Sequence, residues 1–226
     1  MTATSARHIV LMGDSIFDNH SYVRYGPEGK SNDVITHIKN RIKENNSNDN
    51  ATLIAVDGNV IKDVSRQIKK IPKDSTHIFL SIGGNDALRA MYTLDQKVNS
   101  VGEALLTIYG SAFKTFQTEY RSMLDQIQKE APDANLTLCL IYNPRYEDEK
   151  MKIMTKVGLA SLNDLIIQEA VQRKLPVIDL RSMFNEYDDY ANSIEPSHQG
   201  GQKISICIMN IVQNHDFKRP TTTLYV

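Results

Sequence analysis

The segment IVLMGDSIFDN, residues 9–19, decides how the fold is read, because its apolar run ends abruptly on Gly13, Asp14 and Ser15. The run over residues 8–12 is continuously apolar, which is typical of a parallel strand covered on both faces. Ligands of open parallel sheets bind beyond the carboxyl ends of the strands. The serine therefore stands where chemistry is expected, although a GDS triplet is also an ordinary strand-to-helix turn with a capping side chain.

Four further apolar runs, rich in β-branched residues, predict strands: TLIAV at 52–56, HIFLSI at 77–82, LTLCLIY at 136–142 and PVIDL at 176–180. Between them, apolar residues recur at helical spacing over 34–42, 60–71, 98–127 and 157–171, and we interpret these four stripes as core-facing. A last helix is predicted from about Gln199 to Val212. Strands that alternate with helices predict parallel βαβ units in one layered α/β domain.

Composition excludes several function classes. The chain has 226 residues and a net charge of −1, so one sizeable core is expected and no attraction to nucleic acid. Its two cysteines, Cys139 and Cys207, form neither a disulfide framework nor a metal-binding spacing. No apolar run is long enough to span a bilayer, and MTATSARH does not resemble a signal peptide. We expect a cytoplasmic protein of one domain over residues 1–226, with a tail from about residue 214 that either frays or docks on the body.

Glycine also follows the second and third predicted strands, in Asp57-Gly58-Asn59 and in Gly83-Gly84-Asn85-Asp86. Because the carboxyl ends of parallel strands share one edge of a sheet, these turns are expected to meet Ser15 in a common crevice. Each turn taken alone is also explained by capping or by a tight bend. Their order and spacing along the chain point to a shared site.

In that order and spacing the chain resembles the SGNH hydrolase family, also called GDSL esterases and lipases. The resemblance rests on Gly13-Asp14-Ser15 after the first strand, Gly58 in AVDGNV after the second, and Asn85 in SIGGND after the third. It implies a flavodoxin-like, three-layer sandwich with five parallel strands. It also implies a metal-independent esterase with no cofactor, whose substrate is a small-molecule acyl ester and whose nucleophile is Ser15.

Acyl transfer needs donors aimed at the developing oxyanion. The resemblance assigns this oxyanion hole to the backbone amides of Ser15 and Gly58 and to the side-chain amide of Asn85. Asp14 is expected to fix the loop, since neighbouring residues on an extended segment point to opposite sides.

The general base can be placed in two registers. The family's last block is DxxH, which Glu195-Pro196-Ser197-His198 matches with glutamate in place of aspartate, and this gives the triad Ser15, His198 and Glu195. The frame HPSxxG, common in the family, instead puts Glu195 in the histidine's place and Asn192 in the aspartate's. Under that register Glu195 itself accepts the serine proton, which requires a desolvated carboxylate.

The sequence thus predicts a serine ester hydrolase. The alternative is a ligand-binding protein on the same scaffold that is weak or inactive for lack of a well-placed histidine. The segment DALRAMYTLDQ, residues 86–96, is a candidate wall for an acyl pocket, and packing against the helix that follows explains it equally well.

Overall fold

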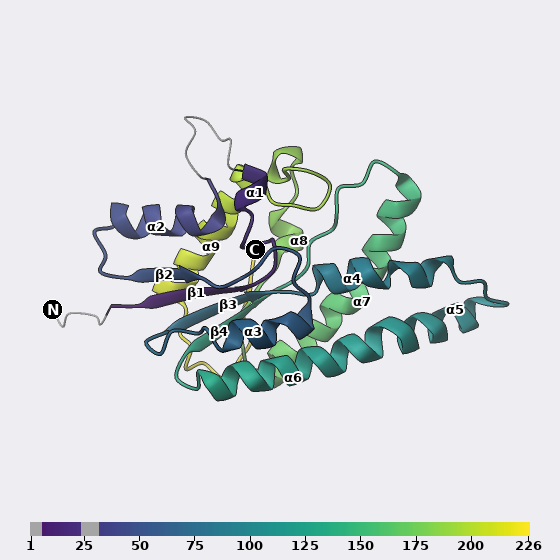
Figure 1. Cartoon of the computed structure of the whole chain (residues 1–226), viewed down its shortest axis with the longest axis horizontal. Coiled ribbons are helices and arrows are strands. Elements are labelled where there is room, and N and C mark those ends of the chain that lie inside the picture. Colours follow the sequence, from purple (N-terminus) through teal and green to yellow (C-terminus); the bar gives the residue numbers. More distant parts are fainter. Residues whose placement is uncertain (1–5, 24–31) are drawn as a thin grey trace.

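The computed structural model describes residues 6–23 and 32–226 and contains an open, all-parallel sheet (Figure 1). Its strand order is β2-β1-β3-β4-β5-β6, and every neighbouring pair is parallel. The strands are β1 His8–Gly13, β2 Asn50–Leu53, β3 His77–Ser81, β4 Asn135–Cys139, β5 Val177–Ile178 and β6 Leu224–Tyr225. The chain reverses its direction across the sheet after β2, which places the ends of β1 and β3 side by side at the point where parallel sheets bind ligands.

Helices alternate with these strands as predicted. The α-helices are α1 His20–Val23, α2 Val34–Glu44, α3 Val64–Ile68, α4 Gly84–Ala90, α5 Val101–Ile108, α6 Lys114–Glu130, α7 Glu149–Arg173, α8 Leu180–Met183 and α9 His198–Asn214. Short 3₁₀ turns occupy η2 Ile61–Asp63, η3 Met91–Asp95 and η5 Tyr187–Asp189, and a π-helical turn, η4 Tyr109–Phe113, joins α5 to α6.

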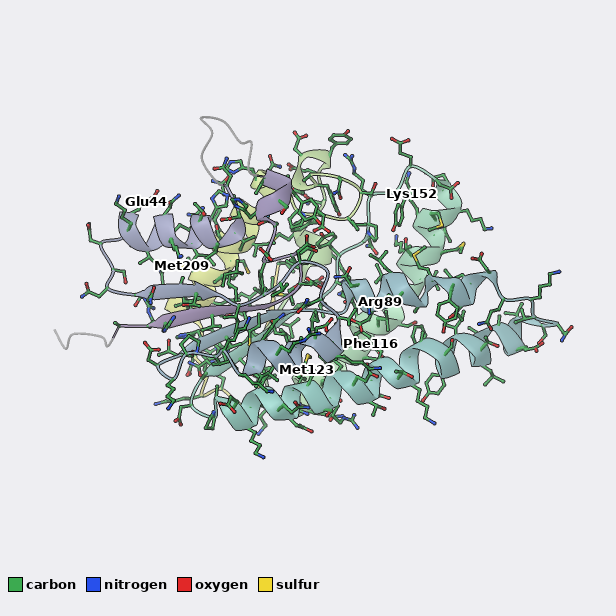
Figure 2. The ribbon with its side chains drawn as sticks, viewed as in Figure 1. Glu44, Arg89, Phe116, Met123, Lys152 and Met209 are labelled. Carbon is green, nitrogen blue, oxygen red and sulfur yellow. The ribbon has the colours of Figure 1, made fainter. Side chains whose placement is uncertain are left out.

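Each face of the sheet has its own apolar core. On one face, α2 and α9 pack together over β1 and β3; on the other, α3, α6 and α7 cover the same strands and β4 (Figure 1). Met209 of α9 and Met123 of α6, labelled in Figure 2, belong to these two opposite cores. The result is the three-layer α/β sandwich that the sequence predicts. None of the described helices combines the length and the apolar character that crossing a bilayer would require.

The sheet has six strands where the sequence predicts five. The five predicted strands are all present, and the sixth comes from the tail, which docks as β6 beside β5. The amides of Val177 and Asp179 donate to the carbonyls of Thr223 and Tyr225, at 2.9 and 2.7 Å. The predicted last helix is α9, which begins at His198 and ends at Asn214.

The interpretation of the third and fourth apolar stripes as entirely core-facing is wrong. Val101 and Leu105 of α5 are 80% and 65% exposed, and Val157 and Val171 of α7 are exposed as well. In Figure 1, α5 extends beyond the sheet, whereas α6 runs beneath it. Helical periodicity reports which residues share a face, and it does not report whether the sheet is long enough to cover that face.

Deleting residues 223–226 is expected to lower the free energy of unfolding by about 2–3 kcal/mol, because two strand hydrogen bonds and the packing of β6 are lost. Urea unfolding followed by circular dichroism measures this difference. Val226→Ala, which alters an exposed side chain in the same segment, is the control. Equal stability of the deletion and the full chain would show that β6 contributes nothing.

Candidate active site

The turn that carries Ser15 begins where β1 touches β3. Gly13 has a φ of 126°, and a Cβ on this residue would lie 1.7 Å from the carbonyl oxygen of Ser81. The next amide, that of Asp14, donates to the same carbonyl at 3.1 Å. Glycine is therefore required both by the dihedral angle and by the close approach of the two strands. The chain leaves β1 in a fixed direction, with Ser15 two residues beyond.

Gln67 of α3 fastens this turn from the other side. Its side-chain oxygen accepts from the amide of Gly13 at 2.8 Å, and its nitrogen donates to the Gly13 carbonyl at 2.7 Å. The same nitrogen donates to the side chain of Asn59 at 2.9 Å, in the loop after β2. Sequence reasoning missed Gln67, because a polar residue inside an apolar helical stripe carries no signal of what it binds.

The loop after β3 is tied to the loop after β2 in turn. The side-chain nitrogen of Asn85 donates to the carbonyl of Asn59 at 3.0 Å, and the carboxylate of Asp86 accepts from the amide of Ile61 at 3.1 Å. The three turns predicted to share one crevice are therefore hydrogen-bonded to one another. An amide nitrogen carries two hydrogens, so Asn85 keeps one donor for a ligand.

A cavity of about 120 Å³ opens between these turns and the segment before α9. Ser15, Asn85 and Glu195 all line it. Ser15 and Glu195 are 6% and 5% exposed, so the cavity holds their polar atoms largely away from water. Gly58, in an exposed part of the loop after β2, is not among the described residues that line the cavity.

Glu195 is positioned by its own loop. The side-chain oxygen of Asn192 accepts from the amides of Ile194 and Glu195, both at 2.9 Å, which closes a tight turn. Beyond it, Ser197 caps α9 by accepting from the amide of Gly200. Asn192 stands at the position that the second register assigns to the aspartate. Its side chain, however, accepts from the backbone amides of Ile194 and Glu195 and does not bind the Glu195 carboxylate.

The hydroxyl of Ser15 is a hydrogen-bonding neighbour of the Glu195 carboxyl and lowers its pKa. Burial raises the pKa of Glu195 from its ordinary value near 4.5 to about 7; the hydrogen bond from Ser15 opposes this rise only in part, and the charge of Asp57 adds to it. The other carboxyl oxygen, Oε2, is buried and has no hydrogen-bond partner within residues 6–23 and 32–226. A carboxylate with one free oxygen and a pKa near neutrality matches what a general base needs.

His198 lies elsewhere. It is the first residue of α9, and its ring packs against that of His37 on α2 with centroids 4.8 Å apart. Its Nδ1 is buried without a hydrogen-bond partner in the described part of the chain, and His198 is not among the described lining residues of the cavity. The structure brings Ser15, Asn85 and Glu195 together and leaves Gly58 and His198 outside the cavity.

Two further carboxyl groups lie close to this centre. Burial raises the pKa of Asp14 well above its usual range, and the charges of Glu195 and Asp86 raise it further. Burial likewise raises the pKa of Asp86 to about 6. Asp14 accepts from the amide of Ile16 at 3.2 Å, which is the loop-fixing contact expected of it. In the described chain, no group of three or more His, Cys, Asp or Glu side chains is arranged to hold a metal ion.

A family model described as the GDSL-like lipase/acylhydrolase family matches residues 11–203. The chain belongs to this family. It is therefore an enzyme of ester hydrolysis, and the resemblance given by Gly13-Asp14-Ser15 and Gly83-Gly84-Asn85-Asp86 is confirmed at the level of the family. Among curated proteins, none matches the sequence.

Solved structures of similar fold include lipases and esterases. The chain superposes on an extracellular lipase from Streptomyces rimosus with a TM-score of 0.66 and 18% identity, covering 91% of this chain and 99% of the lipase. For phospholipase A1 from Streptomyces albidoflavus the TM-score is 0.65, with 18% identity and coverage of 91% and 99%. For an acetyl xylan esterase from Geobacillus stearothermophilus it is 0.61, with 16% identity and coverage of 93% and 96%. At these identities the likeness establishes the fold.

Replacing Glu195 by Gln is expected to stabilise the protein at high pH. The folded pKa of about 7 lies above the ordinary value of 4.5, so the native state holds this proton more tightly than the unfolded state and stability falls as pH rises through that window. At about pH 8 the Glu195→Gln protein should be more stable than the wild type by about 2–3 kcal/mol, and near pH 4 the two should converge.

Thermal unfolding across this pH range measures the difference. Glu147→Gln, which neutralises an exposed glutamate, is the control. Its stability should equal that of the wild type at both high and low pH. A constant difference between wild type and Glu195→Gln at all pH values would contradict a raised pKa.

Proposed function

We propose that the protein hydrolyses acyl esters with Ser15 as nucleophile and Glu195 as the general base, a serine–carboxylate pair in place of a serine–histidine pair. The observation that carries the proposal is that Ser15 and Glu195, both buried, line one cavity in which the carboxyl neighbours the serine hydroxyl and has a pKa of about 7. A glutamate with its ordinary pKa near 4.5 is a poor base for a hydroxyl, and desolvation removes this objection by raising the pKa of Glu195.

The reaction balances with these two side chains. The Ser15 oxygen attacks the acyl carbon while its proton passes to Glu195, and the carbonyl oxygen becomes an oxyanion. The intermediate collapses, the C–O bond to the leaving alcohol breaks, and Glu195 returns the proton to that alcohol. Water then attacks the acyl-enzyme, gives its proton to Glu195, and the acid leaves as Ser15 regains a proton.

Hydrogen-bond donors that line the same cavity can stabilise the oxyanion. The free amide hydrogen of Asn85 and the backbone amide of Ser15 meet this requirement, and removing one such donor usually lowers the rate by about 10²–10³-fold. Gly58 as the third donor stays a prediction. Its loop is linked to Asn85 through Asn59, so a modest shift of that loop on substrate binding would be needed to bring its amide into the cavity.

A panel of four proteins tests the roles. With p-nitrophenyl esters, Ser15→Ala should lose at least about 10³-fold in kcat/KM and Glu195→Gln roughly 10²–10⁴-fold, because the nucleophile and its base are removed separately. His198→Ala should hydrolyse the esters at essentially the wild-type rate. Loss of activity in His198→Ala would restore the first register, in which Glu195 orients His198 and Glu195→Gln is impaired as well. No activity in the wild type would favour the ligand-binding alternative.

The pH profile gives an independent reading. Since the base acts as a carboxylate, kcat/KM is expected to rise with pH, reach half its maximum near pH 7 and then stay level, because only the deprotonated form of Glu195 accepts the serine proton. Carboxyl ionisation has almost no enthalpy, whereas imidazole ionisation has a large one. The midpoint should therefore stay fixed between low and high assay temperature, and a midpoint that falls on warming would indicate a histidine.

A further inference from the structure

Beyond Ser15, the cavity continues as an apolar pocket away from the sheet. Its walls come from α4 and η3, from the end of α5 with η4, and from the first half of α7. In Figure 1 these segments lie together on one side of the sheet, where the first half of α7 rises beyond α4. Among the described lining residues, Asp14 and Glu195 are the charged ones, and both stand at the Ser15 end. The far part of the pocket thus offers mainly hydrocarbon surface and has no charged side chain among its described lining residues; the hydroxyl of Thr93 there pairs with that of Ser111 at 3.3 Å.

The α7 wall is one face of that helix. Residues 154, 155, 158, 159 and 162 recur at helical spacing, and all of them line the pocket. Thr155 uses its hydroxyl on the carbonyl of Met151 in its own helix, so it adds no free polar group. Gly158 stands in the middle of this face, and a Cβ built on it would meet no atom within 4 Å. The absence of a side chain at Gly158 therefore leaves open a space that any larger residue would occupy.

Another wall contains the π-helical turn η4, Tyr109–Phe113. Such a turn inserts one residue into a helix and is frequently found at functional sites. Ile108, Ala112 and Phe113 all line the pocket, and Phe113 also packs against the core beneath α6. The turn thus supplies a further apolar wall of the pocket.

We propose that this pocket receives the linear acyl chain of the substrate and that Gly158 sets the chain length it accepts. The inference rests on the proposed function, since the acyl carbon must sit at Ser15 for its chain to enter the pocket. A dry apolar cavity of about 150 Å³ holds a benzene molecule, so 120 Å³ corresponds to on the order of five carbon atoms. The preferred substrate is accordingly a medium-length ester such as a hexanoate, in contrast to an acetate.

Hydrolysis of a p-nitrophenyl series from acetate to hexadecanoate tests the proposal. Each methylene that enters the pocket should raise kcat/KM by about fourfold, which corresponds to about 0.8 kcal/mol. The hexanoate-to-acetate ratio of kcat/KM should then be on the order of 10² in the wild type and at least about tenfold lower in Gly158→Leu. Gly102→Leu, at an exposed glycine in the first turn of α5 that is not among the described lining residues, should keep the wild-type ratio.

A binding measurement separates this inference from the proposed function. Ser15→Ala protein is titrated with methyl hexanoate and with methyl acetate, and the change in Tm is recorded. Stabilisation by hexanoate alone, lost in Ser15→Ala/Gly158→Leu, supports the pocket even if no ester is hydrolysed, in which case the proposed function fails and the pocket stands. Hydrolysis with a flat chain-length profile, or a ratio unchanged by Gly158→Leu, overturns the pocket and leaves the proposed function intact.

Discussion

The close contact between the ends of β1 and β3 is the constraint on which the site depends. Because Gly13 has no side chain, the Asp14 amide can reach the carbonyl of Ser81, and Gln67 then fixes the same turn to the loop after β2. Asn85, in the turn after β3, donates a hydrogen bond to the same loop. Three segments far apart in the sequence are thus held to one another by backbone-directed hydrogen bonds, and Ser15 and Asn85 reach one cavity without flexible intermediaries.

Burial raises the pKa of the Glu195 carboxyl to about 7, close to the pKa of an imidazole in water. Taking Glu195 out of water disfavours its charged form, and the nearby carboxyls of Asp14 and Asp86 are disfavoured in the same way. This arrangement opposes stability at neutral pH, as strained or desolvated groups at active sites commonly do. The same desolvation that weakens the fold is what the proposed role of Glu195 as general base requires.

Much of the architecture could be predicted because it follows from hydrophobic pattern. Continuous apolar runs predicted strands β1–β5, and glycine after the first three of them predicted the crevice. Both signals are local in the sequence. The choice between Glu195 and His198 could not be made, because the two residues are three positions apart and the start of α9 decides which one faces Ser15. Gln67 was missed for a related reason: its partners lie 54 and 8 residues away, and no local pattern records them.

The docked tail also bears on how the molecule behaves among its own copies. A sheet edge with unpaired amides is a template for another chain, and short edge strands are one way in which proteins blunt that hazard. The two residues of β6 cover the amides of β5. Because β6 is so short, it leaves little open backbone with which another protein chain could pair. Pairing of residues 224–225 with β5 therefore shortens the stretch of open backbone at which a second copy of the chain could add a strand.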